Sequence, residues 1–151
     1  MKTEQFGPQG DAAVNRGELQ RLVRDRLRDA QVLLAGRRWT GAYYLSGYAV
    51  ECALKSCVIA HLMRTDQLPE RHYSEQCWTH NLKQLVTLAG LKADLDASAA
   101  RDPDLERHWD VVKDWNESTR YTRQSRAKAL ALYKSITDSK HGVLRWIRSR
   151  W

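Results

Sequence analysis

The sequence predicts an all-α protein, an antiparallel up-and-down bundle of four to five helices. Two observations support this. Apolar residues recur at spacings of three and four along most of the chain, and no stretch alternates apolar with polar residues as a strand would. The 151 residues, 42% of them hydrophobic and 28% charged, suffice for one compact domain but not comfortably for two.

The first helix is predicted from about residue 18 to 38. Leu19, Val23 and Leu27 fall on one face, and arginines fill the other. Gly36, followed by two arginines, is typical of the C-terminal end of a helix.

The second helix is predicted from about residue 40 to 64 and is apolar nearly all round. A helix of this kind belongs in the middle of a bundle, because a surface helix would show one polar face. Its centre, GYAVECALKSC at 47–57, nevertheless carries Glu51 and Lys55 one helical turn apart. If the carboxylate of Glu51 is covered, it needs a cationic partner besides Lys55. We expect that partner to be Arg120 or Arg123. Gly47, at the start of this stripe, allows another backbone or helix to approach closely.

The remaining elements follow from turn formers and apolar spacing. Thr79 or Asn81 is expected to cap the third helix, and Gly142 to bend or end the last one. In chain order they are a loop at 65–80, a helix at 81–90, a helix from about 94 that is interrupted at 102–103 and resumes to about 115, a connection at 116–122, and a long helix at 125–146 or beyond.

Residues 1–16 are expected to form a flexible tail, and residues 17–151 a single domain. The tail lacks the apolar core of a secretory signal, and no apolar run approaches the roughly 18 to 20 residues of a membrane span. A cytoplasmic protein that does not enter a membrane is therefore expected. The three cysteines form no C-x-x-C pair, so we expect reduced thiols, with Cys52 and Cys57 as small core residues. No metal and no cofactor is predicted.

The formal net charge of +7 is compatible with RNA, DNA or a nucleotide as a partner. The basic residues are dense in RYTRQSRAK at 120–128, which leads into the last helix. Arg120, Arg123 and Arg126 beside free helix amides would suit a phosphate, although a solvated charge run is the alternative. Tyr121 would either stack on a base or anchor this segment in the core. Thr122 or Ser125 would cap the last helix.

Three segments carry a resemblance to a known family. They are AYYLSGYAVECALKSCV at 42–58, THNLKQLVTLAGL at 79–91, and Trp115 with the Arg120–Tyr121 pair. Together they resemble the HEPN family, and the resemblance covers about residues 18–148. It implies a bundle of four or five helices, usually a homodimer. Members occur beside minimal nucleotidyltransferases in toxin–antitoxin pairs, in antiphage defence, and as nucleotide-binding modules.

Many HEPN proteins are metal-independent ribonucleases with an R-x(4–6)-H motif. In those, the arginine and histidine of two protomers meet at the dimer interface and promote attack of the ribose 2′-hydroxyl on the adjacent phosphate. This sequence departs from that pattern, because the junction DWNESTRYT has Thr119 where the histidine would fall. An R-x(6)-H does occur earlier, from Arg101 to His108. If Pro103 opens a helix, Arg101 lies outside it and cannot share a face with His108.

Three functions follow as expectations. The first is a dimeric HEPN-type module that binds a nucleotide or RNA phosphate, or a partner such as a nucleotidyltransferase-like antitoxin. Its anion site would be formed by Arg120, Tyr121, Arg123 and Arg126, with Glu51 as the internal counter-charge. The second is a ribonuclease toxin that uses Arg101 and His108 or a variant set around Arg120. The third is a pure protein-interaction module with a basic surface.

Overall fold

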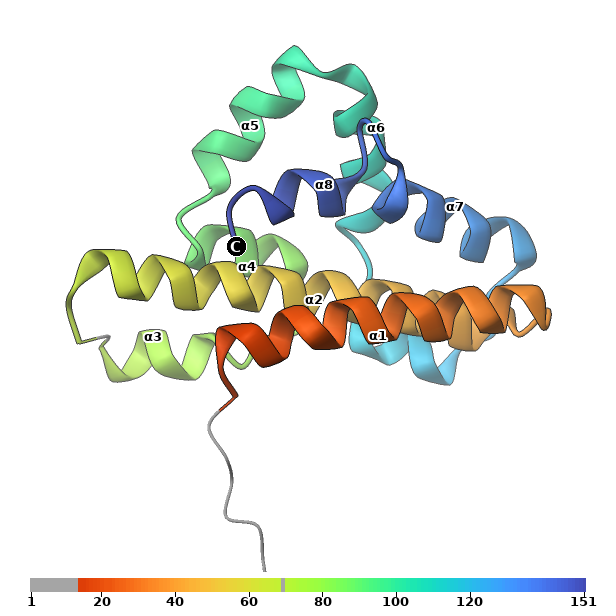
Figure 1. The fold of residues 1–151 in the computed structure, drawn as a ribbon, viewed down its shortest axis with the longest axis horizontal. Helices are drawn as coiled ribbons and strands as arrows, with labels where there is room; N and C mark the ends of the chain where they lie inside the picture. The colour runs from red at the N-terminus through yellow and green to blue at the C-terminus, as the bar shows by residue number, and fades with distance from the viewer. Residues whose placement is uncertain (1–13, 69) are drawn as a thin grey trace, which may run out of the picture.

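The computed structural model describes residues 14–68 and 70–151, and it is an all-α helical bundle, as predicted (Figure 1). No strand occurs among these residues. Within the same part of the chain, no helix combines the length and apolar character needed to cross a membrane. The elements are α1 (Arg16–Ala35), α2 (Trp39–Thr65), α3 (Arg71–Gln76), α4 (Leu82–Leu88), α5 (Lys92–Arg101), α6 (Pro103–Val112), the 3₁₀ helix η1 (Glu117–Tyr121), α7 (Arg126–Thr137) and α8 (Val143–Arg148).

Helices α1 and α2 form an antiparallel hairpin along the length of the molecule (Figure 1). The side chain of Asn15 accepts a hydrogen bond from the backbone N of Glu18 at 2.9 Å, and the Glu18 carboxylate accepts one from the backbone N of Asn15 at 3.1 Å. This capping box starts α1 at Arg16, one residue before the predicted domain boundary. Of the predicted tail, residues 1–13 lie outside the described residues.

A three-residue link reverses the chain between α1 and α2. The left-handed conformation expected of a helix end falls on Arg37, whose φ is 58°, whereas Gly36 has a φ of −81°. The backbone N of Arg38 donates to the carbonyl of Leu33 at 2.8 Å, which closes the turn in the manner of a Schellman motif. The prediction that α1 ends near Gly36 is thus confirmed, but a different residue adopts the left-handed conformation.

Helix α2 is the centre of the bundle, as its all-round apolar pattern predicted. It contacts α1, α4, α7, α8 and η1. Gly47 lies in this helix directly against the indole of Trp115, and a Cβ at Gly47 would come within 2.3 Å of the ring carbons. The close approach expected at Gly47 is therefore made by an aromatic ring, and that ring is itself fully buried.

Two segments predicted as irregular contain short helices. Helix α3 lies within the predicted loop at 65–80, and none of its residues is buried. The hydroxyl of Tyr73 donates to the carbonyl of Leu88, which ties α3 to the end of α4. The predicted connection at 116–122 contains η1, whose first turn is capped by the side chain of Asn116. Both helices are too short and too polar to leave an apolar periodicity.

The long last helix predicted from residue 125 is two helices. Ser125 caps α7 by accepting a hydrogen bond from the backbone N of Lys128 at 3.2 Å. The chain then turns at Asp138, whose side chain accepts from the backbone N of Lys140 and of His141 at 2.9 and 2.7 Å. A Cβ at Gly142 would lie 2.4 Å from the carbonyl oxygen of Asp138, so only glycine fits this turn. Helix α7 thus already ends at Thr137, before the Asp138 turn, and Gly142 instead directly precedes the first residue of α8.

Candidate functional site

The carboxylate in the middle of α2 is buried and paired. Glu51 is only 2% exposed. One of its oxygens accepts a hydrogen bond from the ammonium of Lys55 at 2.9 Å, and Nδ1 of His80 lies 2.9 and 3.0 Å from the two oxygens. Both partners help to compensate the desolvation of the carboxylate, which would otherwise be strongly unfavourable.

The expected pairing of Glu51 with Arg120 or Arg123 is wrong. No ion pair or hydrogen bond joins Glu51 to either arginine among the described residues. Arg120 instead reaches α2 beside Tyr44, seven residues before Glu51. At 1.5 Å per residue this is about 10 Å along the helix axis, too far for direct contact. The partner comes from the start of α4, not from the junction before α7.

His80 directly precedes Asn81 at the start of α4. Capping is done by Asn81, whose side chain accepts from the backbone N of Gln84 at 3.1 Å. Because the ionised carboxylate of Glu51 can only accept hydrogen bonds, Nδ1 of His80 carries the proton between them. Nε2 is then the available ring nitrogen, and the side chain of His80 is 47% exposed. A buried carboxylate thus orients a histidine whose other nitrogen can meet a ligand.

Two tyrosines continue the same face of α2 toward its N-terminus. Tyr44, Tyr48, Glu51 and Lys55 follow one another at spacings of three and four, and we call these four residues the α2 stripe. The rings of Tyr44 and Tyr48 stack with centroids 6.2 Å apart and planes 4° apart. Burial, followed by the neighbouring Cys52, raises the pKa of Tyr48. Tyr44 also lies 5.9 Å from the ring of Trp115, so the stripe rests on the core.

The Arg120–Tyr121 pair lies at the N-terminal end of the α2 stripe. The guanidinium of Arg120 is 4.8 Å from the centre of the Tyr121 ring. The nearby tyrosine hydroxyls, first that of Tyr121 and then that of Tyr44, raise the pKa of Arg120. Tyr121 is 78% exposed, so anchoring in the core, one of the two roles considered for it, is wrong. Figure 1 shows α3 and the segment of η1 on the same side of α2, one toward each end.

The other two predicted anion-binding residues lie on the adjoining surface. Arg123 and Arg126 are exposed. The backbone N of Gln124 donates to the hydroxyl of Thr40 at 3.0 Å and holds their segment to the start of α2. The structure therefore brings together Arg120, Tyr121 and the tyrosines of the α2 stripe, leaves Arg123 and Arg126 beside them, and separates Glu51 from all three arginines.

The R-x(6)-H pair is divided between two helices. Arg101 is in the last turn of α5 and exposed, Asp102 caps α6, and Pro103 opens α6, as the sequence suggested. His108 lines a hollow of about 340 Å³ between α6 and α7. Arg101 does not line that hollow, but Arg107, Lys134 and His141 do.

A second histidine–carboxylate pair was not foreseen. Nδ1 of His141 lies 2.8 Å from one oxygen of Asp102, and the other oxygen accepts from the backbone N of Asp104 and of Leu105 at 3.1 Å each. The bond to His141 is the main cause of a lowered pKa of Asp102. Asp102 thereby ties the α5–α6 junction to the turn before α8. No local sequence signal links residues 39 positions apart.

The residues Asp102, Asp104 and His141 place three potential ligand atoms within 4.8 Å of one another. They are the kinds of ligand that a divalent ion uses. However, Asp104 also pairs with Arg107, and Lys140 lies on the adjacent turn. This positive surrounding disfavours a cation.

Comparison with known proteins identifies no relative: no family model, curated protein or solved structure matches the chain.

Proposed function

We propose that this protein is a HEPN-like helical module that binds the phosphates of RNA or a nucleotide on the α2 stripe, between His80 and Arg120. The observation that carries the proposal is the buried Glu51 that orients His80. A carboxylate that is 2% exposed in the centre of the core helix destabilises the fold unless partners compensate its desolvation. Here one of these partners is His80, whose side chain is partly exposed to solvent.

The groups on this face suit a nucleic acid ligand. Arg120 offers a guanidinium, which matches phosphate geometry. The aromatic rings of Tyr44, Tyr48 and the exposed Tyr121 lie nearby, and aromatic rings beside cations are the usual platform for unstacked bases. From Tyr44 to Lys55 the stripe extends about 16 Å, longer than one phosphate requires. A short single strand or a nucleotide with several phosphates fits this length.

Charge supports the same conclusion. Lys55 forms the ion pair with Glu51, so the exposed Arg120, Arg123 and Arg126 are not needed to compensate the charge of that buried carboxylate. An anion approaching this end of α2 therefore meets cations that are not paired with Glu51.

Binding of a fluorescent single-stranded RNA of about ten nucleotides, measured by anisotropy at two salt concentrations, tests the proposal. Arg120→Ala and His80→Ala should each weaken binding at least fivefold. Arg148→Ala, which removes another exposed arginine, from α8, is the matched control and should change the affinity less than twofold. Equal losses in Arg120→Ala and Arg148→Ala would mean that only overall charge matters, and the proposal would fail.

A second candidate function is a metal-independent ribonuclease. Its supporting observation is that His108 and His141 line one hollow together with Lys134 and Arg107. Two histidines can act as general base and general acid, and the cations can stabilise a phosphorane-like transition state. Arg101 has no part in this arrangement. Cleavage of RNA in the presence of a chelator, abolished by His108→Ala, would support this function, and full activity of His108→Ala would exclude it.

The HEPN resemblance also leads us to propose a homodimer and a nucleotidyltransferase-like partner in a toxin–antitoxin or defence system. A pure protein-interaction module is the third candidate, supported by exposed Met63, Leu68 and Trp78 near the end of α2 and around α3. Sedimentation of the purified chain tests the dimer. Binding to a partner protein without any affinity for RNA or nucleotides would favour the interaction module.

A further inference from the structure

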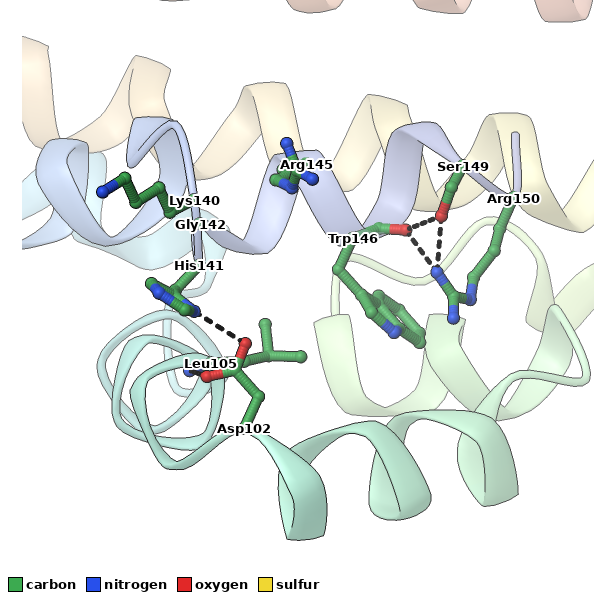
Figure 2. A pocket seen from close by; sticks show the side chains of 9 residues that line it. All are labelled: Asp102, Leu105, Lys140, His141, Gly142, Arg145, Trp146, Ser149 and Arg150. Carbon is green, nitrogen blue, oxygen red and sulfur yellow. Dashed lines mark hydrogen bonds and ion pairs between the residues drawn. The ribbon is translucent and has the colours of Figure 1, made fainter.

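A hollow of about 420 Å³ lies between α8 and the α5–α6 junction (Figure 2). Its volume is within the range of sites that hold small molecules. The side chains of His141 and Trp146 face those of Asp102 and Leu105 across it, whereas that of Lys140 points away from them (Figure 2). It is separate from the α2 stripe, none of whose residues lines it.

The floor of this hollow is apolar and flat. Leu105 is buried, and the side chain of Trp146, which is 9% exposed, extends from α8 beside it (Figure 2). The ring nitrogen of Trp146 is buried and has no hydrogen-bond partner among the described residues. A buried donor without a partner is unfavourable, and an acceptor that reaches it gains a hydrogen bond.

One wall is formed by Arg150, which covers the indole. Its guanidinium carbon lies 4.2 Å from the centre of the Trp146 ring. It donates to a carboxylate oxygen of Asp94 and, at 2.8 Å, to the carbonyl of Trp146. The charge of Arg150 is thereby neutralised.

The rim carries a surplus of positive charge. Lys140 and Arg145 are exposed and line the hollow, and neither has a carboxylate partner among the described residues. Arg145 makes one hydrogen bond, to the carbonyl of Ser139 at 3.2 Å, which leaves most of its donors available. The single carboxylate on the lining, Asp102, is already bonded to His141. A cation would be repelled here, whereas an anion would be attracted.

His141 completes the polar side. Its Nδ1 lies 2.8 Å from one oxygen of Asp102, and its Nε2 lies 3.9 Å from a carboxylate oxygen of Asp104, so the ring is held between the two carboxylates. The lining thus combines one flat apolar surface with an oriented imidazole and two unpaired cations.

We propose that this hollow binds a small organic phosphate, with its phosphate near Arg145 and Lys140 and its flat or apolar part against Leu105 and Trp146. The size and the indole favour a nucleoside monophosphate over a sugar phosphate. The inference does not depend on the α2 stripe.

Titration calorimetry on the full chain tests the proposal with three probes: inorganic phosphate, ribose 5-phosphate and a nucleoside monophosphate. The nucleoside monophosphate should bind most tightly, and Arg145→Ala should weaken it at least tenfold. Arg148→Ala removes the same charge from the same short helix without touching the hollow, so it should leave the affinity within twofold. Arg120→Ala should have no effect, which separates this site from the α2 stripe.

Amide chemical shifts provide a second readout that does not depend on stability. The ligand should shift the amides of residues 140–150, and inorganic phosphate alone should shift fewer of them. Absence of binding by all three probes at millimolar concentration would overturn the proposal. Equal weakening by Arg145→Ala and Arg148→Ala, or shifts confined to the α2 stripe, would also overturn it.

Discussion

Glu51 and His80 are 29 residues apart in the chain, yet both carboxylate oxygens lie within 3.0 Å of the imidazole Nδ1. This contact joins the middle of the core helix to the start of α4. It satisfies a buried charge and fixes an exposed histidine in one orientation. Four predictions follow from this and from other contacts in the fold.

Replacing Glu51 by alanine should lower the free energy of unfolding by about 3 kcal/mol, because Lys55 and His80 would lose the partner that compensates their partial burial. Urea denaturation measures the change. Glu75→Ala is the control, since Glu75 pairs with Arg71 at the surface and the loss should stay below about 0.5 kcal/mol. A loss below about 1 kcal/mol in Glu51→Ala would contradict the structural importance of this contact.

Gly47→Ala should destabilise the protein by about 2 kcal/mol or more, because its Cβ would overlap the buried indole of Trp115. Thermal unfolding followed by circular dichroism measures this. Gly17→Ala, in the first turn of α1, meets only ordinary contact with Asn15 and should be neutral or slightly stabilising. If both variants unfold at the same temperature, the close packing of Trp115 on α2 is incorrect.

Low pH should lower the stability of the region where α5, α6 and α8 meet. The pKa values of Asp94, Asp102 and Asp138 are lowered below the ordinary 3.8, mainly by Arg150, by His141 and by the backbone N–H of His141, respectively. A carboxyl with a lowered folded pKa contributes stability above its unfolded pKa and loses it as the pH falls through the folded value. The free energy of unfolding should therefore decline below about pH 4.

Asp102→Asn isolates one part of this effect, because asparagine still caps α6 but carries no charge. The difference in stability between the wild type and Asp102→Asn should be full at pH 5 to 6 and should shrink as the pH approaches 2. Asp29→Asn, an exposed position on α1, is the control. A difference that is independent of pH would show that the bond to His141 does not depend on the charge of Asp102.

The thiols should differ in reactivity. Burial raises the pKa of Cys52 to about 11 and that of Cys57 to about 12. Cys77 is only partly buried, and burial raises its pKa as well. Iodoacetamide at pH 8 should modify Cys77 slowly and the other two only after unfolding, because the thiolate is the reactive form. Mass spectrometry of the native protein checks this, and rapid labelling of Cys57 would contradict its place in the core.

Much of the fold could be predicted from local patterns. The spacing of Leu19, Val23 and Leu27 predicts α1, and the apolar residues on all sides of α2 predict its central position. Asn81 and Ser125 are cap residues by type and position in the sequence, and both cap their helices in the structure. These features depend on neighbours within a few positions, which a single sequence displays directly.

The candidate site was harder to predict because its contacts are distant in the chain. The pairing of Glu51 with His80 depends on where α4 packs on α2, and no periodicity encodes that position. Two local signals were nevertheless available: Tyr44 and Tyr48 share a helix face with Glu51, and His80 directly precedes the Asn81 cap. The break before α8 was ambiguous, since the apolar spacing continues past Gly142 and only the Asp138 turn interrupts it.

The α1–α2 hairpin has a consequence for how the chain folds. Its two helices are joined by three residues, so closing them requires little loss of chain entropy, and their contacts are mostly local in sequence. Helix α8 packs on α2 although the two are far apart in sequence, so this contact closes a long loop. We therefore expect the hairpin to form early and the contacts around His141 to form later.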